Sequence, residues 1–257
     1  MNDLTHSRKK LIMVQDKPVS IIGIPIYQGV NLLDVAAPAE MFYWMGEKSG
    51  KPCEIYLIAE TETEILTLNQ VRLSPHKTFN QSPQLDLLWV PGGSIEALER
   101  EMTNNKYLDF LKRQSEAAQY VTSVCEGALL LASAGLLNGY RATTHWRFIP
   151  CLKEFSQVEV VEGYPRCVVD DRQGMEKGIR VTGGGISSGL DEALELVKRI
   201  AGEEIAQKVQ VSTQYFPDPP VCADLDKVVE TLEANNQYNC LLHRKPCKVG
   251  SQQPSST

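Results

Sequence analysis

The chain contains 257 residues, 42% of them hydrophobic and 23% charged, which is typical of a folded globular protein and excludes a disordered one. Its 26 Lys and Arg residues against 32 Asp and Glu residues leave a formal net charge of −6 at pH 7. That balance argues against nucleic acid as a partner, because nucleic-acid binders normally carry a basic face. No apolar run approaches the roughly 18 residues needed to cross a membrane, so a membrane partner is not expected.

Strand and helix patterns alternate along most of the chain. Residues 1–16 are mostly polar and are predicted to form a disordered leader. Their apolar stretch is too short to be the core of a signal peptide. Strands are predicted at residues 19–26, 53–59, 85–90, 120–124, 158–161, 167–170 and 179–182, and helices at residues 33–45, 106–118, 128–137, 190–200 and 203–211. Pro38 lies inside the first helix, where it predicts either a kink or a later first turn. This alternation predicts an α/β sandwich with a mostly parallel central sheet and helices on both faces.

The domain organisation follows from the same pattern. The short strands at residues 158–161 and 167–170 are predicted to form a hairpin with each other. Residues 17–221 are expected to form one domain. Residues 222–257 are expected to be a polar C-terminal tail, because so short a segment cannot hold a second domain of ordinary size.

The most informative loop follows the predicted strand at residues 120–124. Cys125 comes directly after that strand, and an apolar helix begins a few residues later. A tight turn of this kind lifts its central side chain over the edge of the sheet, and the start of the helix should lower the pKa of a thiol there. A small buried cysteine without chemistry fits the same local pattern about equally well.

The other six cysteines are scattered, form no Cys-x-x-Cys pair and follow no secretion signal. We therefore expect them to be inert and the protein to be reduced and cytoplasmic, with no disulfide framework and no zinc site.

Four residues could support a reactive thiol at Cys125. Gly92 and Gly93 follow the adjacent strand and could offer backbone N–H groups, although Pro-Gly-Gly is also an ordinary turn. Asp34 lies at the start of a helix, where capping is its simplest role. His145 is near a strand end, so a Cys–His pair is conceivable, but a buried, hydrogen-bonded histidine is at least as common.

Residues 185–189 (Gly-Ile-Ser-Ser-Gly) match the G-x-S-x-G turn of serine hydrolases. Such an enzyme needs an acid and then a histidine downstream, and His243 in the polar tail is the one histidine that follows. The match therefore does not predict a serine hydrolase.

Several separated motifs together resemble the ThiJ/PfpI superfamily, within the class I glutamine amidotransferase-like fold, and its isonitrile hydratase branch in particular. The matching segments are Leu33-Asp34 with Pro38 and Glu40, Val90-Pro91-Gly92-Gly93, Val121-Thr122-Ser123-Val124-Cys125 with Gly127-Ala128, Ala134-Gly135-Leu136-Leu137, Arg141-Ala142-Thr143-Thr144-His145-Trp146, Thr182-Gly183-Gly184-Gly185-Ile186 with Gly189, and Tyr215 with Pro217, Pro219 and Pro220. The resemblance covers about residues 19–221.

The resemblance implies a flavodoxin-like three-layer sandwich, a homodimer, a small-molecule substrate, and no metal or organic cofactor. Cys125 would attack the terminal carbon of an isonitrile, Asp34 would supply the proton, and water would release an N-substituted formamide. Backbone groups of Gly92, Gly93 and Glu126 would stabilise the intermediate. Supporting or pocket positions would be Glu40, Thr144, His145, Trp146, Gly184, Gly185 and Ile186.

One residue departs from the family pattern. The position after the cysteine is usually Thr in the hydratase branch and His in the protease-like branch, whereas Glu126 occupies it here. A second carboxylate should oppose ionisation of the thiol unless it points away or is protonated, although a helix start partly offsets that effect. The alternatives to an isonitrile hydratase are a glyoxalase or deglycase that acts on reactive carbonyls, and a non-enzymatic thiol sensor.

Overall fold

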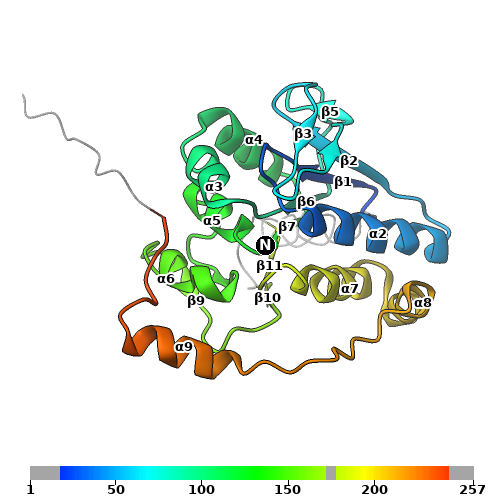
Figure 1. The fold of residues 1–257 in the computed structure, drawn as a ribbon. Helices are drawn as coiled ribbons and strands as arrows, with labels where there is room; N and C mark the ends of the chain where they lie inside the picture. Colours follow the sequence, from blue (N-terminus) through cyan, green and yellow to red (C-terminus); the bar gives the residue numbers. More distant parts are fainter. Residues whose placement is uncertain (1–17, 172–177, 243–257) are drawn as a thin grey trace, which may run out of the picture.

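A seven-stranded, mostly parallel sheet forms the centre of the computed structural model, which describes residues 18–171 and 178–242 (Figure 1). The strands are β1 (Ile21–Pro25), β2 (Glu54–Ala59), β3 (Ile65–Leu66), β4 (Arg72–Leu73), β5 (Lys77–Thr78), β6 (Leu87–Val90), β7 (Tyr120–Ser123), β8 (Arg141–Ala142), β9 (Glu159–Val160), β10 (Cys167–Asp170) and β11 (Ile179–Gly183). The helices are α2 (Leu32–Ser49), α3 (Ile95–Glu101), α4 (Asn105–Ser115), α5 (Gly127–Ser133), η1 (Trp146–Phe148), α6 (Ile149–Leu152), α7 (Ser188–Ala201), α8 (Glu203–Thr213) and α9 (Leu225–Ala234). The predicted leader, residues 1–16, lies outside the described residues.

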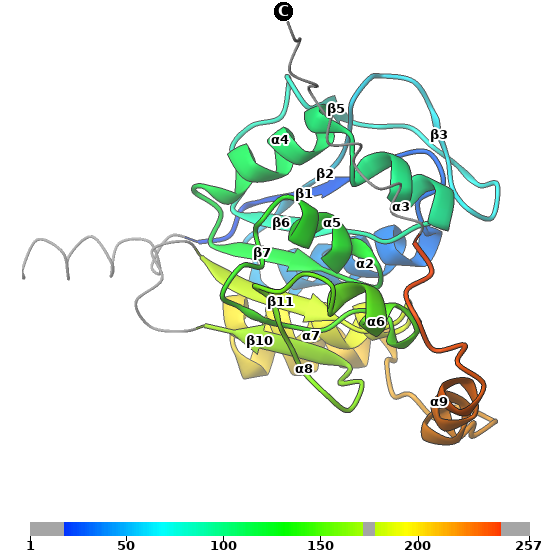
Figure 2. The ribbon, with the colours of Figure 1, turned by 90° about the vertical axis from the view of Figure 1, so that its left-hand side faces the viewer.

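The strand order in the sheet is β10-β11-β7-β6-β1-β2-β5, and all neighbours are parallel except β10, which is antiparallel to β11. Helices α2, α7 and α8 pack together on one face, while α3, α4 and α5 cover the other (Figure 2). The predicted three-layer α/β sandwich is confirmed. Because β11, β7, β6 and β1 run in the same direction, the loops that follow them meet at one edge of the sheet.

Burial on both faces explains the apolar composition of the central strands. All four residues of β6 (Leu-Leu-Trp-Val) and all four of β7 (Tyr-Val-Thr-Ser) are buried. Trp89 in β6 has no exposed surface, and its indole N–H donates to the main-chain oxygen of Asp34 at 2.9 Å. The sheet core therefore also fixes the start of α2. None of the described helices combines the length and apolar character needed to cross a membrane.

The predicted hairpin between the strands near residues 158–161 and 167–170 is wrong. The first of these strands, β9, pairs in parallel with β8, and β10 pairs with β11 through the register Cys167↔Gly183. Each strand is too short for its own side-chain pattern to specify a partner. Strand β11, buried at four of its five positions, pairs with β10 instead.

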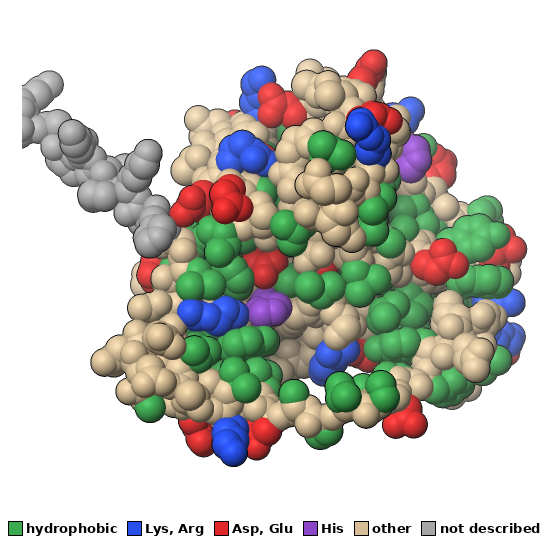
Figure 3. Space-filling model, in the orientation of Figure 1, with side chains coloured by type: hydrophobic (Ala, Val, Ile, Leu, Met, Phe, Trp, Pro, Cys, Tyr) green, Lys and Arg blue, Asp and Glu red, His purple; other side chains and the backbone are tan. Residues whose placement is uncertain are grey.

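The predicted polar tail also contains structure. Residues 217–242, which we call the C-terminal strap, include α9 and cross one side of the molecule, and the space-filling view shows a recess between the strap and the body (Figure 3). Asp224 caps α9 by accepting from the Lys227 N–H at 3.0 Å, and Val229 in α9 is buried. The remaining predicted tail residues, 243–257, lie outside the described part of the chain.

A disulfide between Cys151 and Cys240, 89 residues apart, fastens the strap to α6. Beside it, Arg147 donates to the main-chain oxygens of Gln237 and Asn239, and Tyr238 stacks on Trp146. The expectation that Cys151 and Cys240 are reduced is therefore wrong. Their pairing depends on how the strap docks, which the spacing of cysteines in the sequence does not reveal.

Candidate functional site

Cys125 occupies a strained turn between β7 and α5. Its φ angle is 56°, in the left-handed region that side chains rarely adopt. The Cys125 N–H donates to the oxygen of Gly184 at 2.8 Å, and the Thr144 hydroxyl donates to the oxygen of Cys125 at 2.7 Å. Gly127 has no room for a side chain, since a Cβ there would collide with the oxygen of Val90. The surroundings thus hold the strained conformation in place, as in the nucleophile turns of α/β enzymes.

Asp34 faces the same turn from the first turn of α2. It has no exposed surface, and its Oδ2 accepts from the Gly92 N–H at 2.9 Å. One of its carboxyl oxygens also lies within 4.8 Å of the Cys125 sulfur. Its simplest predicted role, capping the helix, is therefore not the one observed, because the described hydrogen bond of the carboxyl is with Gly92.

The Glu126 side chain lies beside the thiol instead of pointing away. One of its carboxyl oxygens lies within 4.8 Å of the Cys125 sulfur. A Cβ on Gly92 would collide with the carboxyl, so the glycine makes room for it. Glu126 consequently fills space beside Gly92, one of the glycines expected to offer a backbone donor to a reaction intermediate.

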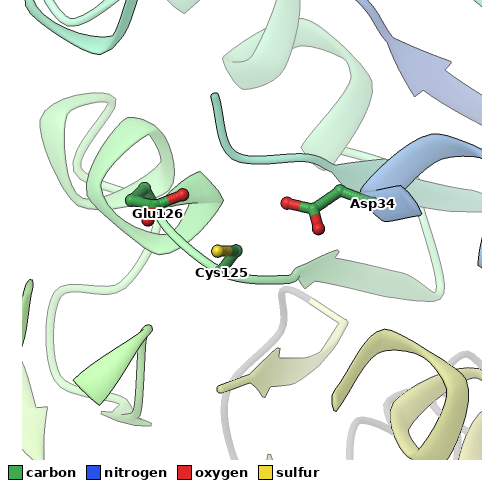
Figure 4. Close-up of side chains that lie close together, drawn as sticks. All are labelled: Asp34, Cys125 and Glu126. Carbon is green, nitrogen blue, oxygen red and sulfur yellow. The ribbon is translucent and has the colours of Figure 1, made fainter. Parts of the chain in front are cut away.

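These three side chains form a compact, buried cluster (Figure 4). One donor atom from each of Asp34, Cys125 and Glu126 lies within 4.8 Å of the other two. Asp34 and Cys125 are 0% exposed and Glu126 is 7% exposed. A substrate can therefore reach the sulfur only after a neighbouring group moves, and Glu126, which alone of the three touches solvent, is the obvious one to do so.

Burial and the two carboxyl groups set the protonation of the cluster. Burial raises the pKa of the Cys125 thiol well above its ordinary value, and the charges of Asp34 and Glu126 raise it further. Burial is also the main reason why the pKa values of Asp34 and Glu126 are raised. The expectation that the helix start lowers the pKa of Cys125 is wrong, because desolvation and two acidic neighbours outweigh the dipole of a helix of only seven residues.

The remaining predicted residues surround the turn to different degrees. The His145 ring packs against Gly185, its Nδ1 accepts from the Arg147 N–H at 3.1 Å, and no hydrogen bond between His145 and Cys125 occurs among the described residues. Ile186 is 38% exposed. Glu40 is exposed and accepts from the Trp44 indole at 3.0 Å, and no described contact joins it to the cluster. The Cys–His alternative gains no support from these contacts.

Sequence reasoning missed Glu192, which lies on α7 with 0% exposed surface. Neither of its carboxyl oxygens has a hydrogen-bond partner, and a Cβ on Gly183 would collide with the group. Burial raises its pKa well above the ordinary value, and the charge of Asp34 adds to the shift. A signal was present in the sequence, since position 192 falls on the apolar stripe that also holds Ala193, Leu196 and Val197.

A cavity of about 310 Å³ is lined in part by Tyr27, and its lining does not include Asp34, Cys125 or Glu126. The Tyr27 ring abuts Gly93 and donates its O–H to the oxygen of Pro91 at 3.0 Å. Tyr27 therefore contacts both the cavity and the glycine turn next to the cluster.

Comparisons with known proteins find relatives in both sequence and fold. The profile of the DJ-1/PfpI family matches residues 21–198. The chain is 35% identical over 199 residues to the isonitrile hydratase of Pseudomonas putida, covering 77% of this chain and 80% of that protein. It is 24% identical over 198 residues to the HTH-type transcriptional regulator GbdR of Pseudomonas aeruginosa, but covers only 50% of it.

A solved structure resembles the whole fold. The crystal structure of a ThiJ/PfpI family protein from Pseudomonas syringae superposes with a TM-score of 0.72 at 29% identity, covering 86% of this chain and 87% of that one. The family profile spans more than half of the chain, and the P. putida relative is matched over most of its length. The chain therefore belongs to the DJ-1/PfpI family.

Proposed function

We propose that the chain is a cofactor-independent hydro-lyase that adds water to an isonitrile, R–N≡C, and releases the N-substituted formamide R–NH–CHO. The observation that carries this proposal is a cysteine thiol in a strained turn close to the buried carboxyl group of Asp34, whose pKa burial raises well above its ordinary value. The similarity to the isonitrile hydratase of P. putida supports the same substrate class.

The first half of the reaction uses Asp34 and Cys125. The terminal carbon of an isonitrile carries a lone pair, so it accepts a proton from the Asp34 carboxylic acid. The Cys125 sulfur then forms a bond to that carbon, and its proton passes to the Asp34 carboxylate, which restores the acid. The product of this half is a thioimidate, R–N=CH–S–Cys125.

The second half consumes one water molecule. Its oxygen adds to the carbon of the thioimidate and a proton moves to the nitrogen. The carbon–sulfur bond then breaks, the sulfur regains a proton, and the formamide leaves. The Cys125 sulfur is fully buried and the Glu126 carboxyl lies beside it, so substrate entry requires the Glu126 side chain to move before the Gly93 N–H can stabilise the intermediate.

Product analysis tests the proposal. Purified protein incubated with a simple alkyl isocyanide should form the corresponding formamide, which NMR spectroscopy identifies directly. A parallel incubation with methylglyoxal, assayed for lactate, tests the carbonyl alternative under the same conditions. Absence of formamide across a panel of alkyl and aryl isocyanides would contradict the proposal, and lactate in its place would assign the site to reactive carbonyls.

Substituting Glu126 by threonine should make the Cys125 thiol more acidic, because the variant removes a negative neighbour and a hydrogen-bond acceptor from a thiol whose pKa both raise. The rate of Cys125 alkylation by iodoacetamide, followed by mass spectrometry over a range of pH, should therefore rise at lower pH than in the unmodified protein. Easier access alone would raise the rate at every pH, so the midpoint of the profile is the relevant quantity.

A matched control for this experiment is Glu96→Thr, which replaces an exposed glutamate in the first turn of α3. That variant should leave the alkylation profile of Cys125 unchanged. An unshifted midpoint in Glu126→Thr would mean that Glu126 does not control the protonation of the thiol.

A further inference from the structure

Two oxygens in the cluster have no hydrogen-bond partner. They are Oδ1 of Asp34 and Oε2 of Glu126, and both atoms are buried. Unpaired buried carboxyl oxygens are rare in folded proteins because each has lost its water without gaining a replacement. They identify a place where the protein presents acceptor atoms to something other than its own donors.

The other oxygen of the Asp34 carboxyl group is held by the backbone, since Oδ2 accepts from the Gly92 N–H at 2.9 Å. Hydrogen bonds of this kind orient ligating carboxylates in metal sites, where one oxygen is fixed and the other binds the ion. Oε2 of Glu126 also lies beside Gly92, where a Cβ would collide with it. The glycine therefore lets the two carboxyl groups approach each other.

The spacing of the donors suits a small ion. In the described part of the chain, Asp34, Cys125 and Glu126 form the one group of three whose donor atoms lie within 4.8 Å of one another. A tetrahedral ion bound to two oxygens and one sulfur separates its donors by roughly 3.3 to 3.5 Å, given bond lengths of about 2.0 and 2.3 Å. A modest inward movement of the three side chains is enough to reach that geometry.

We propose that Asp34, Cys125 and Glu126 bind a thiophilic divalent transition-metal ion of the zinc type through Oδ1, Sγ and Oε2. The sulfur donor selects zinc-like ions over magnesium and calcium, which prefer oxygen donors. Metal binding releases to solvent the proton of the thiol and the proton of each carboxyl group that holds one, so that a thiolate and two carboxylates bind the ion. A fourth position remains for water. An ion bound there would occupy the sulfur and thus prevent it from reacting with other molecules.

Cobalt(II) provides a direct probe, because it substitutes for zinc and reports a sulfur ligand by absorption. Titration of the full chain with cobalt(II) should produce a thiolate-to-cobalt charge-transfer band that saturates at one ion per chain, together with the intense visible bands of a tetrahedral site. Adding zinc should erase the bands, whereas the same excess of magnesium should leave them unchanged.

Variants of each ligand make the assignment specific. Cys125→Ser should abolish the charge-transfer band, and Asp34→Asn and Glu126→Gln should each weaken cobalt binding by at least about tenfold, the scale on which even supporting groups affect metal affinity. The matched control is Cys167→Ser, since Cys167 is a half-buried free thiol with Asp191, Glu192 and Glu195 nearby and could compete for the ion. That variant should keep the full band.

Three results would overturn the site: no charge-transfer band in the unmodified protein, an undiminished band in Cys125→Ser, or unaltered affinity in both carboxyl variants. Circular dichroism and thermal melting establish that each variant is folded. The readout needs no turnover, so it is separable from the proposed function. If the chain binds cobalt but hydrates no isocyanide, the metal site is supported and the proposed hydratase activity is contradicted. If it hydrates isocyanides but binds no cobalt, the hydratase activity is supported and the metal site is contradicted.

Discussion

Replacing Cys125 with serine should reduce isocyanide turnover by about a thousandfold or more, the scale on which loss of a catalytic nucleophile acts in other enzymes. Serine is nearly the same size as cysteine, so the strained turn and its hydrogen bonds to Gly184 and Thr144 should persist. Its hydroxyl group, however, is a far weaker acid than a thiol, and the buried carboxyl groups around it disfavour an anion still more. The expected loss is therefore in kcat, measured as the rate of formamide production.

The control for this variant is Cys222→Ser, which changes an exposed cysteine of the strap and should leave turnover unaltered. Thermal melting of both variants separates loss of chemistry from loss of fold. If Cys125→Ser kept about a tenth of the original rate or more, the sulfur would not be the nucleophile, because no hydroxyl in this environment could replace it that well.

Replacing Glu192 with methionine should stabilise the protein by about 1–3 kcal/mol, the usual penalty of a buried polar group without a hydrogen-bond partner. Neither carboxyl oxygen of Glu192 has a partner, and the side chain is fully buried against Gly183 and Val124. Methionine has nearly the same length and is flexible enough to fill the same space. The free energy of unfolding from urea titration at pH 7 measures the change.

The substitution Glu192→Met should also change how the stability of the protein depends on pH. Burial raises the pKa of Glu192 in the folded state above the ordinary value of 4.5, so the folded protein holds this proton more tightly than the unfolded chain does. Stability from this group is fully present below pH 4.5 and is lost as the pH rises from there through the raised folded-state pKa. Glu192→Met should therefore lose less stability than the unmodified protein when the pH rises from 5 to 8.

The control is Glu230→Met, which changes an exposed glutamate of α9 and should alter neither the unfolding free energy at pH 7 by more than about 0.5 kcal/mol nor its pH dependence. Destabilisation by Glu192→Met would show that the carboxyl group has a favourable partner in solution, such as a buried water molecule.

The parts of the fold that depend on local sequence were predictable. Buried strands such as β1 and β6 are continuous apolar runs, and the loops after parallel strands must meet at one edge of the sheet, so the approach of Cys125, Gly92 and Asp34 follows from topology. Strand pairing for β9 was not predictable, because two residues carry too little pattern to select a neighbour. Helix α9 was missed, although Leu225, Val228, Val229 and Leu232 follow a helical period.

The chemistry of the site was harder to predict than its location. The sequence indicates that Glu126 follows the cysteine, but the direction of its side chain depends on the space left by Gly92, which lies more than 30 residues earlier. The protonation of Cys125 was mispredicted for the same reason. A helix start can be identified from local sequence, whereas desolvation by Asp34 and Glu126 is a property of the assembled site.

The Cys151–Cys240 bond closes the chain between these residues into a covalent ring. That ring contains β11, α7 and the oxygen of Gly184, which holds the backbone of Cys125. A single protease cut within residues 217–224 would therefore not release the strap: the two fragments would migrate as one species on a gel until a reductant separated them. The C-terminal strap is thus covalently linked to the segment that contains Gly184, whose oxygen accepts a hydrogen bond from the Cys125 N–H. A reducing buffer would break that link.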